Sequence, residues 1–132
     1  MRRILALLAA LALLALAGCS GDTSRAAIRL GPSQQFSAAE LQTAADAILS
    51  RFHEFDGCTL LRLSYDEDFS ERQLSLTETP TGQAVVFTSD FEVDWTGASS
   101  GFNPNSTYTD WTWQVTRSDA SAPWEVTNWG VG

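Results

Sequence analysis

The sequence predicts an α+β domain over residues 36–132, in which one long N-terminal helix packs on a curved, mostly antiparallel sheet of three to five strands. Apolar residues recur at three- and four-residue steps over residues 37–56, a pattern typical of an amphipathic helix. They alternate with polar residues over 85–95, as in a strand with one buried face. A helix and a sheet that are each apolar on one face bury those faces against one another. A chain of 132 residues has the length of one such domain.

The first nineteen residues are organised like a secretory signal peptide. Arg2 and Arg3 form a short basic start, and an apolar run over 4–17 follows without interruption. As a helix this run covers about 21 Å, which is less than the roughly 30 Å hydrocarbon core of a bilayer. The run is therefore typical of a signal peptide rather than of a permanent membrane span.

The sequence Leu16-Ala17-Gly18-Cys19 ends this region and resembles the lipobox of bacterial lipoproteins. The resemblance implies that residues 1–18 are a lipoprotein signal peptide, that cleavage leaves Cys19 at the mature N-terminus, and that its thiol is lipidated. Two or more acyl chains anchor a protein durably. We therefore expect a lipid-anchored protein on the extracytoplasmic face of the cell membrane. The alternative is an ordinary signal peptide that happens to contain a cysteine.

The stretch after the lipobox is small and polar and is punctuated by Gly31 and Pro32. Together with the lipidated Cys19, this composition predicts a flexible tether over residues 19–35 that holds the domain off the membrane. Ile28 and Leu30 are the exceptions, because they could pack on the domain or begin a short strand.

Acidic residues dominate the charge of the chain. It has 16 Asp and Glu against 8 basic residues, all arginine, and loss of residues 1–18 changes the formal net charge from −8 to −10. Nucleic-acid binding needs clustered Lys and Arg, so nucleic acid is excluded as a partner. Anionic lipid also repels an acidic domain, which leaves the acyl chains to hold it at the membrane.

The helix predicted over 37–56 has signals at both ends. Ser37 and Glu40 have the spacing of a capping box, and Gly57 is typical of the residue that follows a helix. His53, the single histidine, lies beside the apolar stripe rather than in it. We interpret it as a rim residue near the helix C-terminus, where a positive charge is favourable.

Period-two alternation and turn residues predict the strands, which are 58–65, 85–95, 108–117 and 124–129. Residues 69–78 fit a short helix or a strand, and we favour the helix. Cys58 opens the first strand, and we expect it to be a small buried apolar side chain. If Cys19 carries lipid, Cys58 has no partner for an internal disulfide.

The predicted order of elements resembles the cystatin-like and nuclear-transport-factor-2-like rolls. The closing hairpin carries the likeness, with Thr112-Trp113-Gln114-Val115 on one strand and Trp124-Glu125-Val126 and Trp129-Gly130 on the next. The resemblance implies an α+β roll whose strands curl around the helix. It implies no particular activity, because unrelated functions share such folds.

Several segments within 37–130 are also similar to a family of small lipoproteins of gut-type Gram-positive bacteria. These segments are Phe55–Leu60, Tyr65–Glu67, Ser89–Asp94 and Asn103–Trp111. The family brings no activity that can be transferred to this chain.

A non-catalytic binding or accessory domain, with a protein or small ligand as its partner, is the preferred interpretation. The main alternative is carbohydrate or cell-wall binding through tryptophans at the rim of the sheet. Trp95 and Trp129 stand at strand ends beside the long loop over 96–105, with Tyr108 just after it. Large aromatic side chains at such a rim are favoured binding anchors.

Catalysis would place polar groups in an apolar cone, as roll-type enzymes do. The candidates are Tyr65, Tyr108 and Asp110, with His53 at the rim. Alternation puts Asp110 on the face opposite the strand's tryptophans, and no nucleophile motif or spaced His/Asp pair accompanies these residues. We therefore expect neither an enzyme nor a cofactor.

Calcium is the one metal that the sequence raises. Asp90, Glu92 and Asp94 follow one face of a predicted strand, and carboxylate oxygens suit Ca²⁺. They lack the twelve-residue loop pattern of a calcium site, so we interpret them as a solvated acidic face and expect no metal.

Overall fold

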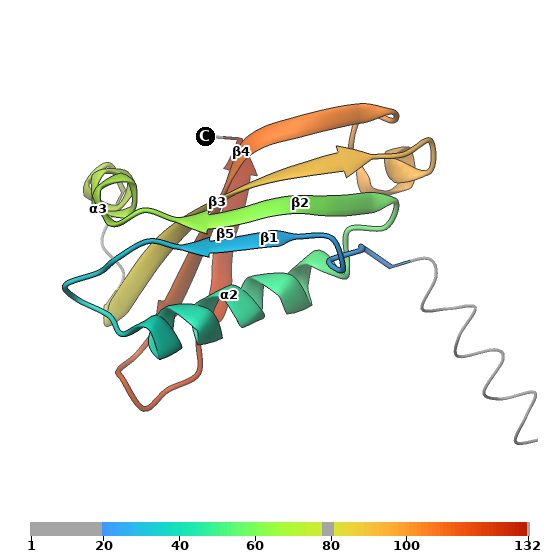
Figure 1. The fold of residues 1–132 in the computed structure, drawn as a ribbon. Coiled ribbons are helices and arrows are strands. Elements are labelled where there is room, and N and C mark those ends of the chain that lie inside the picture. Colours follow the sequence, from blue (N-terminus) through green and yellow to red (C-terminus); the bar gives the residue numbers. More distant parts are fainter. Residues whose placement is uncertain (1–19, 78–80, 132) are drawn as a thin grey trace, which may run out of the picture.

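Five strands and two α-helices make up the part of the chain that the structure describes, residues 20–77 and 81–131 of this computed structural model (Figure 1). In chain order the elements are β1 (Ala27–Leu30), α2 (Ala38–Phe52), β2 (Cys58–Tyr65), α3 (Glu67–Ser75), β3 (Gln83–Val93), the short 3₁₀ helix η1 (Gly97–Ser100), β4 (Ser106–Arg117) and β5 (Glu125–Val131). No helix in the described ranges is long and apolar enough to cross a membrane. The signal peptide and Cys19 lie outside these ranges.

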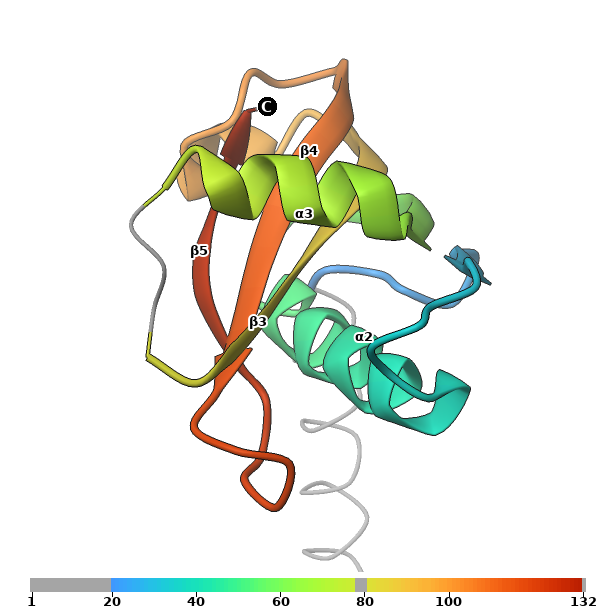
Figure 2. The same cartoon turned by 90° about the vertical axis from the view of Figure 1, so that its left-hand side faces the viewer.

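The strands form one mixed sheet in the order β1-β2-β3-β4-β5. Neighbours from β2 to β5 run antiparallel, whereas β1 runs parallel to β2. Helix α2 connects β1 to β2 and lies beneath the sheet, and α3 lies near the opposite face (Figures 1 and 2). The predicted α+β class, with a helix on a mostly antiparallel sheet, is therefore confirmed.

Helix α2 begins where the capping pattern predicts and ends earlier. The Glu40 backbone N–H donates to the Ser37 hydroxyl, and the Ser37 N–H donates to the Glu40 carboxylate. The helix ends at Phe52, because the next residues tighten into a turn that closes at Gly57 with a left-handed φ of 76°. The prediction of one long N-terminal helix is thus wrong in two respects, since α2 has 15 residues and β1 precedes it.

The segment predicted as a flexible tether is part of the domain. Ile28 and Leu30 lie in β1, opposite Leu63 and Tyr65 of β2. Gly21 comes so close to α2 that a Cβ atom on it would lie 2.0 Å from the carbonyl oxygen of Phe52. The tether prediction was wrong for this segment. Small residues allow the close approach to α2, and backbone pairing fixes it, whereas their composition alone is also typical of a flexible linker.

The core lies between α2 and the sheet. The buried residues of α2 are Leu41, Ala44, Ala45, Ile48 and Phe52. The Phe52 ring contacts those of Phe91 and Trp113, with centroids 5.6 and 6.4 Å apart. Trp111, Trp113 and Trp124 are also buried in this core.

Helix α3 confirms the preference for a helix after β2. Asp66 begins it, and its carboxylate accepts a hydrogen bond of 2.8 Å from the Phe69 N–H. The buried Ser70 hydroxyl accepts one of 2.9 Å from the Val86 N–H, at a point of β3 that β2 does not reach. Helix α3 therefore supplies a partner to β3 beyond the end of β2.

Candidate functional site

An open groove runs between α2 and the chain from Arg117 to Val126, and we call it the α2 groove. Its wider part, of about 710 Å³, lies between the first turns of α2 and the turn that joins β4 to β5. A second hollow of about 540 Å³ continues it along α2 toward Glu54 and β5. Ala47, Ser50 and Trp124 border both hollows, so the two form one continuous depression.

Arg117 is a buried charge at one wall of the α2 groove. It is the last residue of β4, and only 4% of its side chain is exposed. Its Nε donates a 2.7 Å hydrogen bond to Oε1 of Gln83, and its Nη2 is ion-paired with the Glu40 carboxylate. The guanidinium lies over the Trp124 ring, with its carbon 4.2 Å from the ring centroid. Contacts of this kind compensate for the loss of water around a buried charge.

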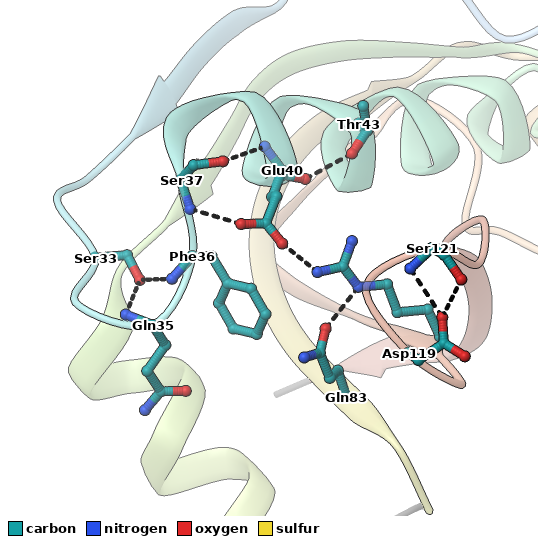
Figure 3. Close-up of polar contacts among 10 residues, drawn as sticks. Ser33, Gln35, Phe36, Ser37, Glu40, Thr43, Gln83, Asp119 and Ser121 are labelled. Atoms are coloured by element: carbon teal, nitrogen blue, oxygen red, sulfur yellow. Dashed lines mark hydrogen bonds and ion pairs between the residues drawn. The ribbon is translucent and has the colours of Figure 1, made fainter.

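Glu40 links this arginine to the start of α2 (Figure 3). One carboxylate oxygen accepts from the Ser37 N–H at 3.1 Å, and the other meets Arg117. The Arg117 guanidinium, followed by the Ser37 backbone, lowers the pKa of this carboxyl below its usual range. The side chain that caps the helix therefore also holds β4 to it.

Sequence reasoning found the capping box and missed Arg117. A signal was present, because Arg117 continues the inward-facing positions of Trp111, Trp113 and Val115 along β4. A charged residue at a core position of a strand is unusual and indicates a buried partner. Spacing could not identify that partner, since Glu40 is 77 residues away in the sequence.

The two tryptophans proposed for carbohydrate binding are both exposed. The exposed fraction is 76% for Trp95 and 40% for Trp129. Arg51 covers the Trp129 ring, with its guanidinium carbon 4.9 Å from the centroid, and the same ring contacts Phe55 and Trp113. Within the described residues no ring contact joins Trp95 to Trp129.

Tyr108 is half-buried and has an internal role. Its ring stacks on Phe91 with centroids 5.1 Å apart and an interplanar angle of 11°. Its hydroxyl accepts a 3.1 Å hydrogen bond from the Asn103 N–H. The side chain thus ties the loop after η1 to the core.

Two of the three calcium candidates, Asp90 in β3 and Asp94 just after it, are held by partners within the chain. Asp90 receives two hydrogen bonds from Arg62, at 2.9 and 3.0 Å, and this contact lowers the pKa of its carboxyl. Asp94 accepts from the N–H and hydroxyl of Thr96, while Glu92 is exposed. In the described ranges no three His, Cys, Asp or Glu side chains are grouped to hold a metal ion. The weak calcium candidates therefore do not converge.

The residues considered for catalysis are also separated. Asp110 has 80% of its side chain exposed and meets Arg62 at 3.3 Å, on the outer face as predicted. Tyr65 is buried against Phe87, and burial raises the pKa of its hydroxyl. His53 lies at the end of α2, with Nδ1 2.8 Å from the Gly21 carbonyl oxygen. Strand β2 separates His53 from Tyr65 by roughly 25 Å, at about 3.3 Å per residue.

Cys58 has the environment of an inert thiol. It is buried and not in a disulfide. Burial, followed by the charges of Asp94 and Asp56, raises the pKa of its thiol from 9.0 to about 11. Because only a thiolate is an effective nucleophile, the predicted role as a small core residue is supported.

Comparison with known proteins finds no match to a protein-family model, to a curated protein or to a solved structure. The class that the geometry itself defines is an α+β domain with an open groove along one helix and one edge of its sheet.

Proposed function

We propose that this protein is a lipid-anchored, non-catalytic binding domain on the extracytoplasmic face of the cell membrane, and that its α2 groove receives an extended segment of a protein partner. The anchor follows from the lipobox that ends at Cys19. The observation that carries the binding role is the α2 groove, which stays open along α2 and follows the edge of the sheet.

The edge strand β5 supports an extended ligand. β5 is the last strand of the sheet and pairs with β4 alone in the described chain. Glu125 and Val126 of β5 line the second hollow of the groove. An edge strand offers unpaired backbone groups to which an extended segment can add as another strand.

The charges of the α2 groove favour a basic segment. Its carboxylates are Glu40, Asp46, Glu54 and Glu125. Its two arginines are each paired with one of them, Arg117 with Glu40 and Arg51 with Glu54. The surplus negative charge complements Lys or Arg on the partner and discriminates against acidic segments.

The proposal is tested by peptide binding to the lipidated full chain in detergent. The probes are ten-residue peptides of alternating Val and Lys, with Val and Glu peptides of equal length for comparison. Ser50 is exposed and borders both hollows, so Ser50→Trp should block the groove. Ala38 is exposed on the same helix outside the groove, which makes Ala38→Trp the matched control.

We expect the basic peptide to bind the wild type and Ala38→Trp equally, and Ser50→Trp at least about tenfold more weakly, a difference of about 1.4 kcal/mol. Equal binding to Ser50→Trp, or no preference for the basic peptide, would overturn the assignment of the groove. Recovery of a mature chain that carries no acyl mass on Cys19 would overturn the lipid anchor.

The resemblance to cystatin-like and nuclear-transport-factor-2-like rolls is retained as a proposal about the fold. Its support is the consecutive antiparallel order of β2 to β5 with α2 across one face (Figure 1). The parallel pairing of β1 departs from an all-antiparallel sheet. An experimental structure with the sheet curved around α2 is expected, and a flat sheet would contradict the proposal.

A further inference from the structure

The chain is fastened to the domain from its first described residues onward. The Gly21 N–H donates to the His53 carbonyl at 3.0 Å, and the Asp22 N–H donates to that of Cys58 at 2.9 Å. The Asp22 carbonyl in turn accepts from the Leu60 N–H at 2.8 Å. Hydrogen bonds on both sides of one residue, and the close approach of Gly21 to α2, leave this segment little freedom.

This attachment leaves almost no chain between the domain and the expected lipid. Cys19 is two residues before Gly21, and consecutive Cα atoms lie about 3.8 Å apart, so their Cα atoms are at most about 8 Å apart. Acyl chains on Cys19 enter the bilayer, which brings the surface around Gly21 to the level of the lipid headgroups. The domain is therefore held on the membrane rather than away from it.

The surface around Gly21 also carries the β3–η1 turn. A hollow of about 480 Å³ is bordered by Ser20 and Asp22 on one side and by Asp94 and Thr96 on the other. Figure 1 shows the blue start of the described chain and the end of β3 at the same end of the domain. We call this surface, formed by residues 20–22, 57–59 and 94–99, the anchor end.

Trp95 projects from the anchor end on an ordered turn. Its neighbours are fixed by hydrogen bonds, from the Asp94 N–H to the Gly57 carbonyl at 2.9 Å and from the Thr96 N–H to the Asp94 carboxylate at 2.7 Å. Gly97 seats against Val93, where a Cβ atom would lie 1.9 Å from Cγ1. The indole is nevertheless 76% exposed. The fold holds this large aromatic side chain outward at the place where the lipid anchor emerges.

Indole rings favour the boundary between lipid and water, because one ring carries an apolar body and a polar N–H. The carboxylates of Asp22 and Asp94 beside Trp95 stay charged, since hydrogen bonds from Ser24 and Thr96 lower their pKa. They repel anionic lipid, so this end would not adsorb by charge. The covalent anchor brings the surface to the membrane, and an inserted tryptophan orients it.

We propose that the anchor end lies against the membrane with Trp95 inserted at the lipid–water boundary, so that the domain has one fixed orientation. The inference rests on the lipidation of Cys19 in the proposed function and adds the residue that contacts lipid. It also places the mouth of the α2 groove. Glu40 and Arg117 lie roughly 20 Å along α2 from His53, at 1.5 Å per residue, so the wider part of the groove is the part farther from the bilayer.

The test uses the acylated full chain in phosphatidylcholine vesicles that carry bromine on the upper part of their acyl chains. Bromine quenches tryptophans that enter the lipid. Trp129→Phe is the matched control for Trp95→Phe, because Trp129 is the other exposed tryptophan. Trp95 is largely exposed, and Phe keeps an aromatic ring in the contacts of Trp129, so both variants should stay folded, which a thermal melt verifies.

We expect the wild type and Trp129→Phe to lose at least twice as much fluorescence as Trp95→Phe. Equal quenching in Trp95→Phe, on protein whose acyl mass is confirmed, would overturn the orientation and leave the anchor intact. Absence of the acyl mass would overturn the anchor and this inference together.

Discussion

The two ends of α2 are joined to the rest of the domain by different kinds of contact. At the anchor end, the carboxylates of Asp22 and Asp94 each bind a residue two positions further along the chain. At the other end, Glu40 binds Arg117 from 77 residues away. At the anchor end the side-chain hydrogen bonds are local and the long-range contacts are between backbone groups. At the other end a long-range contact is made by two side chains, and it forms only when β4 lies beside α2.

This difference indicates what each end can tolerate. Local turns keep their shape when a neighbouring side chain changes, because their hydrogen bonds close within a few residues. A buried ion pair joins distant elements, and loss of one partner leaves the other charge without compensation. We therefore expect substitutions in the ion pair at the α2 groove to destabilise the whole domain. At the anchor end we expect a loss of stability only from substitutions that break backbone contacts.

The largest effect should come from Arg117→Ala. Removal of this buried partner should cost about 3 kcal/mol of unfolding free energy, measured by urea denaturation. Arg51→Ala is the matched control, because Arg51 also pairs with a glutamate and covers a tryptophan ring, but at the surface. It should cost less than about 1 kcal/mol. Equal losses would show that burial does not distinguish the two arginines.

The next effect should come from Gly21→Ala at the anchor end. A methyl group there would meet the Phe52 carbonyl, so residues 20–22 should detach at a cost of about 1–3 kcal/mol. Detachment should also uncover Cys58, whose raised pKa of about 11 makes its thiolate about 100-fold scarcer than at the ordinary value of 9.0.

The measurement is the rate at which Ellman's reagent labels Cys58. We expect faster labelling in Gly21→Ala and the wild-type rate in Arg25→Ala, which changes an exposed side chain nearby. An unchanged rate in Gly21→Ala would mean that the N-terminal segment does not protect Cys58.

The same contrast explains what the sequence could predict. The cap at Ser37, the amphipathic face of α2 and the alternation in β3 and β4 are local patterns, and all are found. Arg117 with Glu40 was missed because the pair depends on contact between distant segments. The tether predicted over residues 19–35 was wrong for a related reason. Residues in this segment are held by backbone hydrogen bonds to β2 and to the end of α2, and composition does not reveal such bonds.

Acid should weaken the contact between Glu40 and Arg117. Its folded pKa lies below the ordinary 4.5, so the contribution of the pair to stability is complete above pH 4.5 and is lost as the pH falls through the folded value. Glu40→Gln should lower the melting temperature at neutral pH, and its difference from the wild type should shrink as the pH falls below 4.5. Asp94→Asn should change less, because the Asn oxygen can still accept from Thr96. Parallel melting curves for Glu40→Gln and the wild type would contradict this role.

The smallest change in unfolding free energy should come from Trp95→Phe. This variant shows whether Trp95 stabilises the fold or is free to contact something outside the chain. Trp124 is 8% exposed and lies against Arg117, so Trp124→Phe should cost about 1 kcal/mol of unfolding free energy. Trp95 is 76% exposed, and Trp95→Phe should stay within about 0.5 kcal/mol of the wild type in urea denaturation. A loss as large as that of Trp124→Phe would make Trp95 a structural residue and remove the reason to seek a contact for it outside the chain. A neutral result leaves a large apolar ring that the fold does not use, held outward close to the proposed lipid anchor, and the membrane is then the surface that we propose covers it.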